Sequence, residues 1–264
     1  MDIEKRYSDS EGRIRMTSTF IKAFMAQKPC PAQLKAIYLE QSVKIETTKA
    51  QRKGLYFETK VLGSSADGSK TITLPLTTAG KKTADQHRIE QQVANFKSVI
   101  KEHEITIQRK QIKIDTVIDK NFALGTVLDI IGIVDEDNPC IIDLKLTANV
   151  NSEWGDFAWG TPELMDHTQA ILSCYIFEQM YDAQPVWYYL LFDYKPESDY
   201  KIIRRTIKGL DYKELQQQLN TIIQQILEWE KADWPYVPTY NNCYTCPLKA
   251  FCTQQITRKP IVNI

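Results

Sequence analysis

Hydrophobic residues recur at helical spacing in several stretches of the chain. The clearest stretch covers residues 83–103, where Thr83 is placed to cap the N-terminus and the apolar positions follow at steps of four, three and four. Residues 213–230 carry a similar apolar stripe behind Asp211, the predicted N-cap. The same spacing predicts further helices over residues 17–27, about 32–43, 54–63, and from Pro162 to about 180.

From residue 105 to residue 147 the pattern changes from a helical period to the composition typical of strands. Three runs rich in Ile and Val cover residues 105–114, 126–135 and 139–147, and the polar turn DEDN separates the last two. These runs predict an antiparallel meander of three or four strands. Residues 185–195 and 201–208 predict another pair of strands after the intervening helix.

Composition limits the class of protein. The 264 residues are 43% hydrophobic and 25% charged, as in ordinary globular proteins, which excludes global disorder. Lys plus Arg and Asp plus Glu balance at 33 each, so any nucleic-acid site must be a local patch. The longest apolar run, residues 186–192, is far shorter than the ~20 residues that cross a bilayer. We therefore expect a soluble, cytoplasmic protein with no membrane partner.

The cysteines are unevenly distributed. Cys243, Cys246 and Cys252 form a C-x2-C-x5-C cluster, and Cys30 lies in a predicted turn between two helices. In a reducing compartment, closely spaced thiols are typical ligands of zinc or of an iron-sulfur cluster, and three ligands need a fourth, for which Cys30 is the best candidate. A chance cluster of free thiols is the alternative. The other two cysteines fall inside apolar patterns and are expected to be buried: Cys140 and Cys174.

Three charged residues interrupt the apolar runs of the predicted meander. Asp143 and Lys145 lie two residues apart in one run, so alternation places them on the same face, and Asp129 lies in the neighbouring run. Charges at such positions are costly to bury unless they are paired or bind a cation. Two aspartates offer hard oxygen ligands for Mg2+, and the lysine could orient or deprotonate an attacking water. The alternative is a buried Asp-Lys salt bridge.

The order Gly125-x3-Asp129, then Asp143-Leu144-Lys145, resembles the PD-(D/E)XK nuclease superfamily in its RecB-like branch. The segment HTQAILSCYIF on the following helix resembles the glutamine motif of that branch, which implies that Gln169 lies near the catalytic lysine. Upstream, KGLYFETKVLG resembles the first motif, with Glu58 where the family has a histidine. Position 173 is Ser where the family usually has a tyrosine.

One Cys-Pro near the N-terminus and the C-terminal trio resemble the cluster-bearing subset of this branch, which includes the AddB nuclease domain and the CRISPR-associated adaptation exonucleases. The resemblance implies a 4Fe-4S cluster, with Zn2+ as the alternative, held by Cys30, Cys243, Cys246 and Cys252. It also implies an α/β, restriction-endonuclease-like fold with a mixed central sheet flanked by helices and with the terminal segments joined by the cluster. We expect a single nuclease domain over 1–264, with its core at about 45–210 and cluster-forming segments at about 18–44 and 211–252.

The function implied is that of a Mg2+- or Mn2+-dependent deoxyribonuclease, an exonuclease acting on DNA ends or single strands, with recombination, phage or CRISPR proteins as partners. Glu58, Asp129 and Asp143 would bind the metal, Lys145 would assist the water and Gln169 would position it. Weaker candidates for nucleic-acid contacts are Trp154, Trp159, Arg204 and Arg205; packing is an equal alternative for the tryptophans. The alternative function is a catalytically inactive nucleic-acid-binding or scaffold protein with structural zinc.

Overall fold

The computed structural model describes residues 7–43, 47–65, 68, 71–135, 137–153, 158–195, 199–239, 243–244, 246–250 and 252. The chain divides into two compact units. We name residues 47–114 and 126–208 the sheet unit, and residues 1–46, 115–125 and 209–264 the terminal unit. None of the described helices is both long enough and apolar enough to cross a membrane.

The sheet is mixed, as the sequence predicts. Its strands in the sheet unit are β2 (Thr106–Val117), β3 (Phe122–Val134), β4 (Asn138–Thr147), β5 (Val186–Asp193) and β6 (Tyr200–Arg205), of which β2 and β3 continue into the terminal unit. β2 pairs with β3, β3 and β4 are antiparallel, β4 and β5 are parallel, and β5 and β6 are antiparallel. The parallel pair requires a crossover connection, which α5 (Thr168–Tyr181) provides.

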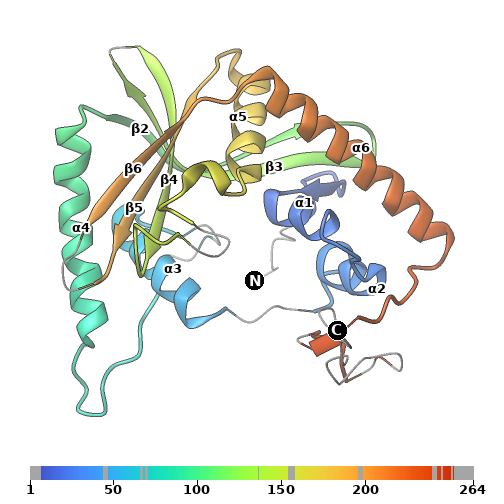
Figure 1. Ribbon diagram of the computed structural model, residues 1–264, viewed down its shortest axis with the longest axis horizontal. Helices are drawn as coiled ribbons and strands as arrows, with labels where there is room; N and C mark the ends of the chain where they lie inside the picture. Colours follow the sequence, from blue (N-terminus) through green and yellow to red (C-terminus); the bar gives the residue numbers. More distant parts are fainter. Residues whose placement is uncertain are drawn as a thin grey trace, which may run out of the picture. The chain divides into compact units, whose positions relative to one another are not determined.

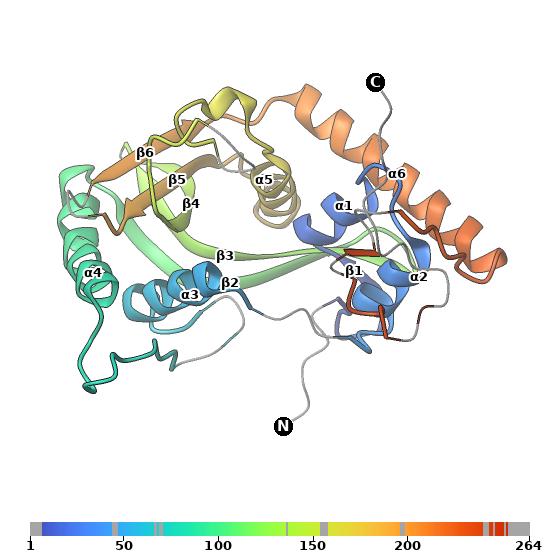
Figure 2. The ribbon, with the colours of Figure 1, turned by 60° about the horizontal axis from the view of Figure 1, so that its bottom comes forward.

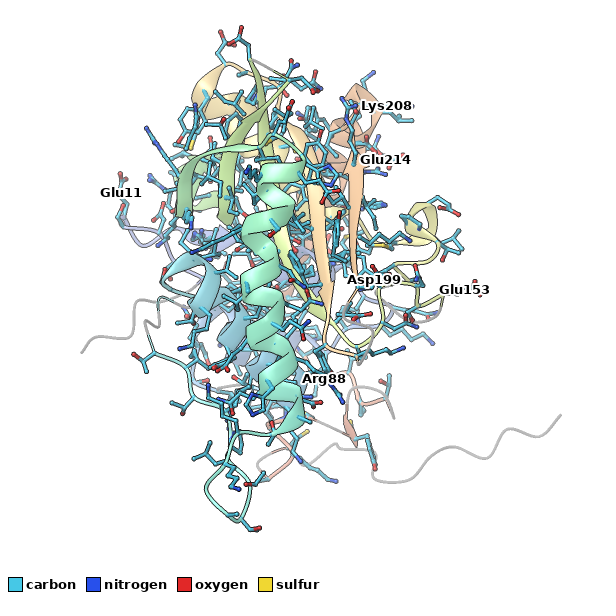
Figure 3. The ribbon with its side chains drawn as sticks, turned by 90° about the vertical axis from the view of Figure 1, so that its left-hand side faces the viewer. Glu11, Arg88, Glu153, Asp199, Lys208 and Glu214 are labelled. Carbon is cyan, nitrogen blue, oxygen red and sulfur yellow. The ribbon has the colours of Figure 1, made fainter. Side chains whose placement is uncertain are left out.

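Helices cover both faces of β4 and β5 (Figure 1). The register pairs Asp143 with Tyr189 and Leu144 with Leu190, so alternation sends the charged residues and the apolar residues of β4 to opposite faces. Helices α3 (Lys49–Leu62) and α4 (Ala84–Glu102) cover the apolar face, and Figure 3 shows α4 lying across it. Their side chains form one core with those of the strands: Phe57, Ile89, Phe96, Ile142, Leu144 and Phe192.

The ends of two helices in this unit differ from the prediction. α3 begins at Lys49 rather than at residue 54, because Thr48 and Gln51 form a capping box that starts the helix one turn earlier. The predicted helix from Pro162 begins only at Thr168: residues Pro162–Leu164 form a short 3-10 turn, η2, and the extended backbone of Met165 ends it. α4 begins behind the predicted N-cap, Thr83.

The terminal unit contains β1 (Ile14–Met16), α1 (Ser18–Phe24), α2 (Pro31–Leu34), the π-helix η1 (Lys35–Leu39) and α6 (Gly209–Lys231). β1 runs parallel to the first three residues of β3. α1 and α6 lie side by side (Figure 2), with the Phe24 and Trp229 ring centroids 5.8 Å apart. The predicted helices over 17–27 and 32–43 are both shorter than expected, and the second changes from an α-helix to the π-helix η1. Asp211 lies in the first turn of α6 rather than at its N-cap.

An ion pair between a buried arginine and a half-buried aspartate explains the glycine four residues before Asp129. Arg15 is 3% exposed, and its Nε lies 2.6 Å from Oδ1 of Asp115 within the terminal unit. A Cβ added at Gly125 would lie closer than 3.0 Å to both the Arg15 guanidinium and this carboxylate. The motif glycine is therefore needed for packing at this position.

We expect Gly125→Ala to lower the free energy of unfolding by about 2–4 kcal/mol, because the added methyl group separates a buried charge from its partner. Chemical denaturation monitored by circular dichroism measures the change. Gly54→Ala is the matched control: nothing lies within 4 Å of a Cβ at Gly54, and alanine in a helix interior is favoured by roughly 1 kcal/mol. Equal stability of the Gly125→Ala variant and the wild type would show that the ion pair tolerates the methyl group.

Candidate active site

Two buried aspartates on neighbouring strands form the centre of the candidate site. Asp129 on β3 is 7% exposed and Asp143 on β4 is 3% exposed. The register pairs Ile130 with Ile142, so its continuation by one residue places Asp129 opposite Asp143. The Leu144 backbone N–H donates to Oδ2 of Asp129 over 2.8 Å and fixes the carboxylate against β4.

Two further predicted residues converge on Asp143. Lys145 Nζ donates to Oδ1 over 2.8 Å, and Gln169 Nε2, from the first turn of α5, donates to the same oxygen over 2.8 Å. Oδ2 of Asp143 lies 2.7 Å from Lys145 Nζ as an ion pair, but it is buried and accepts no hydrogen bond from the described residues. The structure thus brings Asp129, Asp143, Lys145 and Gln169 together and leaves one carboxylate oxygen open to another positive group.

The electrostatics of the two aspartates follow from their burial. Burial raises the pKa of Asp129 well above its ordinary value, and the charges of Asp143 and Glu58 raise it further. Burial alone would lower the pKa of Lys145, but Asp143 and Asp129 outweigh it, and the net shift is upward. Lys145 is therefore held as an ammonium ion, which suits charge stabilisation better than the removal of a proton from water.

The site fits a hard divalent cation. Repulsion between Asp129 and Asp143 and the open oxygen Oδ2 both favour added positive charge. No three His, Cys, Asp or Glu side chains within the described ranges form a ready set of ligands, and the charge of Glu58 acts on Asp129. Mg2+ commonly takes one or two protein carboxylates and completes its shell with water and phosphate, so an aspartate pair is compatible with its usual ligand set.

The predicted nucleic-acid contacts are not all accessible. Trp159 is only 3% exposed and packs against Tyr189, so its indole cannot stack on a base in this conformation; packing is the interpretation that the structure favours. Trp154 lies outside the described residues. Arg204 and Arg205 are adjacent on β6, so their side chains point to opposite faces of the sheet. Arg205 pairs with Trp187, which lies on the same face as Asp143, so of the two arginines it is the one on the face of the site.

The site has further polar residues around it, of which sequence reasoning missed Gln111. Gln111 Nε2 donates to Oδ1 of Asp129 over 3.2 Å. Nε2 of His167 lies 2.8 Å from the Pro162 carbonyl oxygen, and its Nδ1 lies 3.2 Å from the Tyr189 hydroxyl oxygen. Since a carbonyl oxygen only accepts, Nε2 carries the proton, and in the neutral ring Nδ1 accepts from Tyr189, which is paired with Asp143 in the register.

The cysteines fall into two groups. Cys30, Cys243, Cys246 and Cys252 line one cavity of about 20 Å3 in the terminal unit. Burial raises the pKa of Cys246, and the other three thiols raise it further. In the part of the chain that the structure describes, they do not form a ready set of metal ligands. Cys140 and Cys174 are fully buried, as predicted, and burial raises the pKa of Cys140 to about 11.

A mixed sheet that carries paired aspartates beside a D-x-K lysine and a helix glutamine has the architecture of a phosphodiester-hydrolysing nuclease. The family model described as the PD-(D/E)XK nuclease superfamily matches residues 33–253, and the chain belongs to this superfamily. No curated protein matches the chain.

Solved structures are similar to the chain, and the first described here shares its fold. A crystal structure named "Putative exonuclease" from Eubacterium rectale is 16% identical, with a TM-score of 0.65, and the match covers 94% of this chain and 91% of that one. An alkaline exonuclease from Laribacter hongkongensis is 13% identical with a TM-score of 0.46, covering 83% of this chain and 92% of that one. Its complex with dAMP is 12% identical with a TM-score of 0.50, covering 83% and 93%.

We expect Asp129→Asn to stabilise the protein at neutral pH when EDTA is present. Because the pKa of the folded-state carboxyl is raised, its ionisation costs folding free energy as the pH rises above the unfolded value of about 3.9. The variant removes this cost. Its amide oxygen can still accept from Leu144 N–H, and its amide nitrogen can donate to the Gln111 side-chain oxygen once the Gln111 amide turns over. Thermal unfolding should therefore show a Tm gain near pH 7, at about 2–4 °C per kcal/mol, that disappears towards pH 4. A lower Tm for the variant at both pH values would contradict this account.

Proposed function

We propose that the protein is a Mg2+- or Mn2+-dependent deoxyribonuclease of the RecB-like branch that acts as an exonuclease on DNA ends or single strands. The observation that carries the proposal is the convergence of Lys145 and Gln169 on Asp143, opposite Asp129, in a chain of the PD-(D/E)XK superfamily. DNA is chosen because the resemblance implies it and because an exonuclease of similar fold was crystallised with dAMP.

Each residue has a role that its surroundings support. Asp129 and Asp143 would hold the cation, with Oδ2 of Asp143 as the open acceptor and Glu58 as the third carboxylate. A bound divalent cation supplies Lewis-acid polarisation of the phosphate and a lowered pKa for water. Lys145, kept protonated by its neighbours, stabilises negative charge that develops on the phosphate. The Gln169 amide holds the Asp143 carboxylate and orients the attacking water.

We also propose that Cys30, Cys243, Cys246 and Cys252 hold a metal centre within a single domain formed by the whole chain. Four thiolates are the donor set of both a 4Fe-4S cluster and structural zinc. The four thiols line one cavity of about 20 Å3, but among the described residues they do not form a ready set of ligands, so either centre requires the thiols to rearrange around it. Either centre closes a loop of more than 200 residues, which restricts the unfolded chain.

One observation favours the alternative of an inactive nucleic-acid-binding or scaffold protein. Ser173, at the position of the family tyrosine, is fully buried, and its hydroxyl lies 2.9 Å from that of Thr126. This residue is committed to packing between α5 and β3 and supplies no aromatic hydroxyl to the site. The nuclease remains the stronger proposal because the aspartates, the lysine and the glutamine are assembled without it.

The nuclease proposal predicts metal-dependent DNA cleavage that Lys145→Ala lowers by about 10²–10³-fold, the scale of losing one charge-stabilising group. The assay compares linear and circular DNA, single and double stranded, with Mg2+, Mn2+ or EDTA. Lys97→Ala, an exposed lysine on α4, is the matched control and should cleave like the wild type. Sparing of circles identifies an exonuclease. Binding of DNA without cleavage by the wild type would favour the inactive alternative.

The metal-centre proposal predicts stoichiometric metal and a loss of thermal stability on chelation. Anaerobically purified protein should be brown and contain iron if the centre is a cluster; colourless protein with zinc selects the alternative. Iodoacetamide should label the four clustered cysteines only after metal removal, while buried Cys140 and Cys174 stay unlabelled as internal controls. Metal-free native protein with an unchanged Tm after chelator treatment would reject the centre.

A further inference from the structure

The hydrophobic alternation of β2 changes phase in the middle of the strand. Ile105 and Ile107 pack against the core at odd positions, whereas Ile114 is buried and Ile112 half-buried at even positions. The step from Ile107 to Ile112 is five residues, where a regular strand requires an even number. A β-bulge, which adds one residue to one strand of a pair, produces this change of phase.

The backbone marks Gln111 as the irregular residue. Its φ of 50° lies in the left-handed region, and among the described non-glycine residues with positive φ it is the one inside a strand; the others lie in turns, loops and helix ends. Glycine adopts this conformation without strain, whereas a glutamine there is strained and persists only when other interactions hold it.

The Gln111 side chain makes the contact that accounts for this strain. Its amide donates to Oδ1 of Asp129 over 3.2 Å, while Leu144 N–H donates to Oδ2 over 2.8 Å. The Asp129 carboxylate is thereby fixed at both oxygens, one by a neighbouring backbone and one by this amide. Bulges re-aim side chains, and this one turns an amide towards a buried carboxylate.

We propose that Gln111 is a positioning residue that sets the orientation of the Asp129 carboxylate for a divalent cation. The inference rests on the proposed nuclease function and adds to it a residue outside the D-x-K and glutamine motifs. A group that orients a metal ligand typically contributes 10–100-fold to metal affinity or activity. Replacing the amide should therefore weaken the cation site without harming the fold.

Gln111→Gly separates a positioning role from a structural one, because glycine relieves the backbone strain and removes the amide. We expect that the variant loses no Tm in EDTA. Calorimetry should show that Mn2+ binds the DNA-free variant about 10-fold more weakly than the wild type, and cleavage should be about 10–100-fold slower. Gln108→Gly, at an exposed position of the same strand, is the control and should show the reverse pattern: a lower Tm and unchanged Mn2+ binding.

The outcomes are distinct. Unchanged Mn2+ binding and cleavage in Gln111→Gly would overturn the positioning role, and so would a parallel loss of Tm and activity, which would mark Gln111 as a residue that holds the strand. If the wild type neither binds Mn2+ nor cleaves DNA, the proposed nuclease function itself is overturned, and the positioning role with it.

Discussion

The repulsion between two buried carboxylates, Asp129 and Asp143, is the constraint that the rest of the sheet unit satisfies. Neither residue is more than 7% exposed, so water solvates the two charges poorly, and the charge of Asp143 adds to burial in raising the pKa of Asp129. Hydrogen-bond donors compensate the two charges. The Lys145 ammonium and the Gln169 amide donate to Asp143. The Leu144 backbone N–H and the Gln111 amide donate to Asp129. One buried oxygen, Oδ2 of Asp143, forms an ion pair with Lys145 but accepts no hydrogen bond from the described residues, which supports the proposal of a cation site.

The topology of the sheet follows from the same requirement. β4 must present Asp143 to one face and Leu144 to the apolar core on the other, and the alternation of a strand does this without any loop. The parallel pairing of β4 with β5 then requires a crossover, and the crossover helix α5 begins on the charged face. Gln169, in the first turn of this crossover helix, is therefore brought close to Asp143 by the connection between β4 and β5.

The sequence predicted the convergence of Asp143 and Lys145 from alternation, because two-residue periodicity is a local property of a strand, and that of Asp129 from the expectation that the two runs form neighbouring strands. Gln169 needed the family resemblance, since nothing in the helix pattern distinguishes one half-buried amide from another. Gln111 was missed although the five-residue step from Ile107 to Ile112 was readable, because an irregular step shows that a bulge exists without showing where its side chain points. The start of α5 was misplaced because Pro162 is equally compatible with a 3-10 turn.

The motif around β3 combines two unrelated physical causes. Gly125 is required because the ion pair of Arg15 and Asp115 lies where its side chain would be, whereas the Asp129 carboxylate is held by hydrogen bonds from Leu144 and Gln111. A family pattern marks both positions, but the glycine serves packing within the terminal unit, whereas the aspartate is a candidate ligand of the proposed cation site. A chain that kept the glycine and lost the aspartate would retain this packing and lose one carboxylate of the candidate site, so the two requirements can be separated within a single strand.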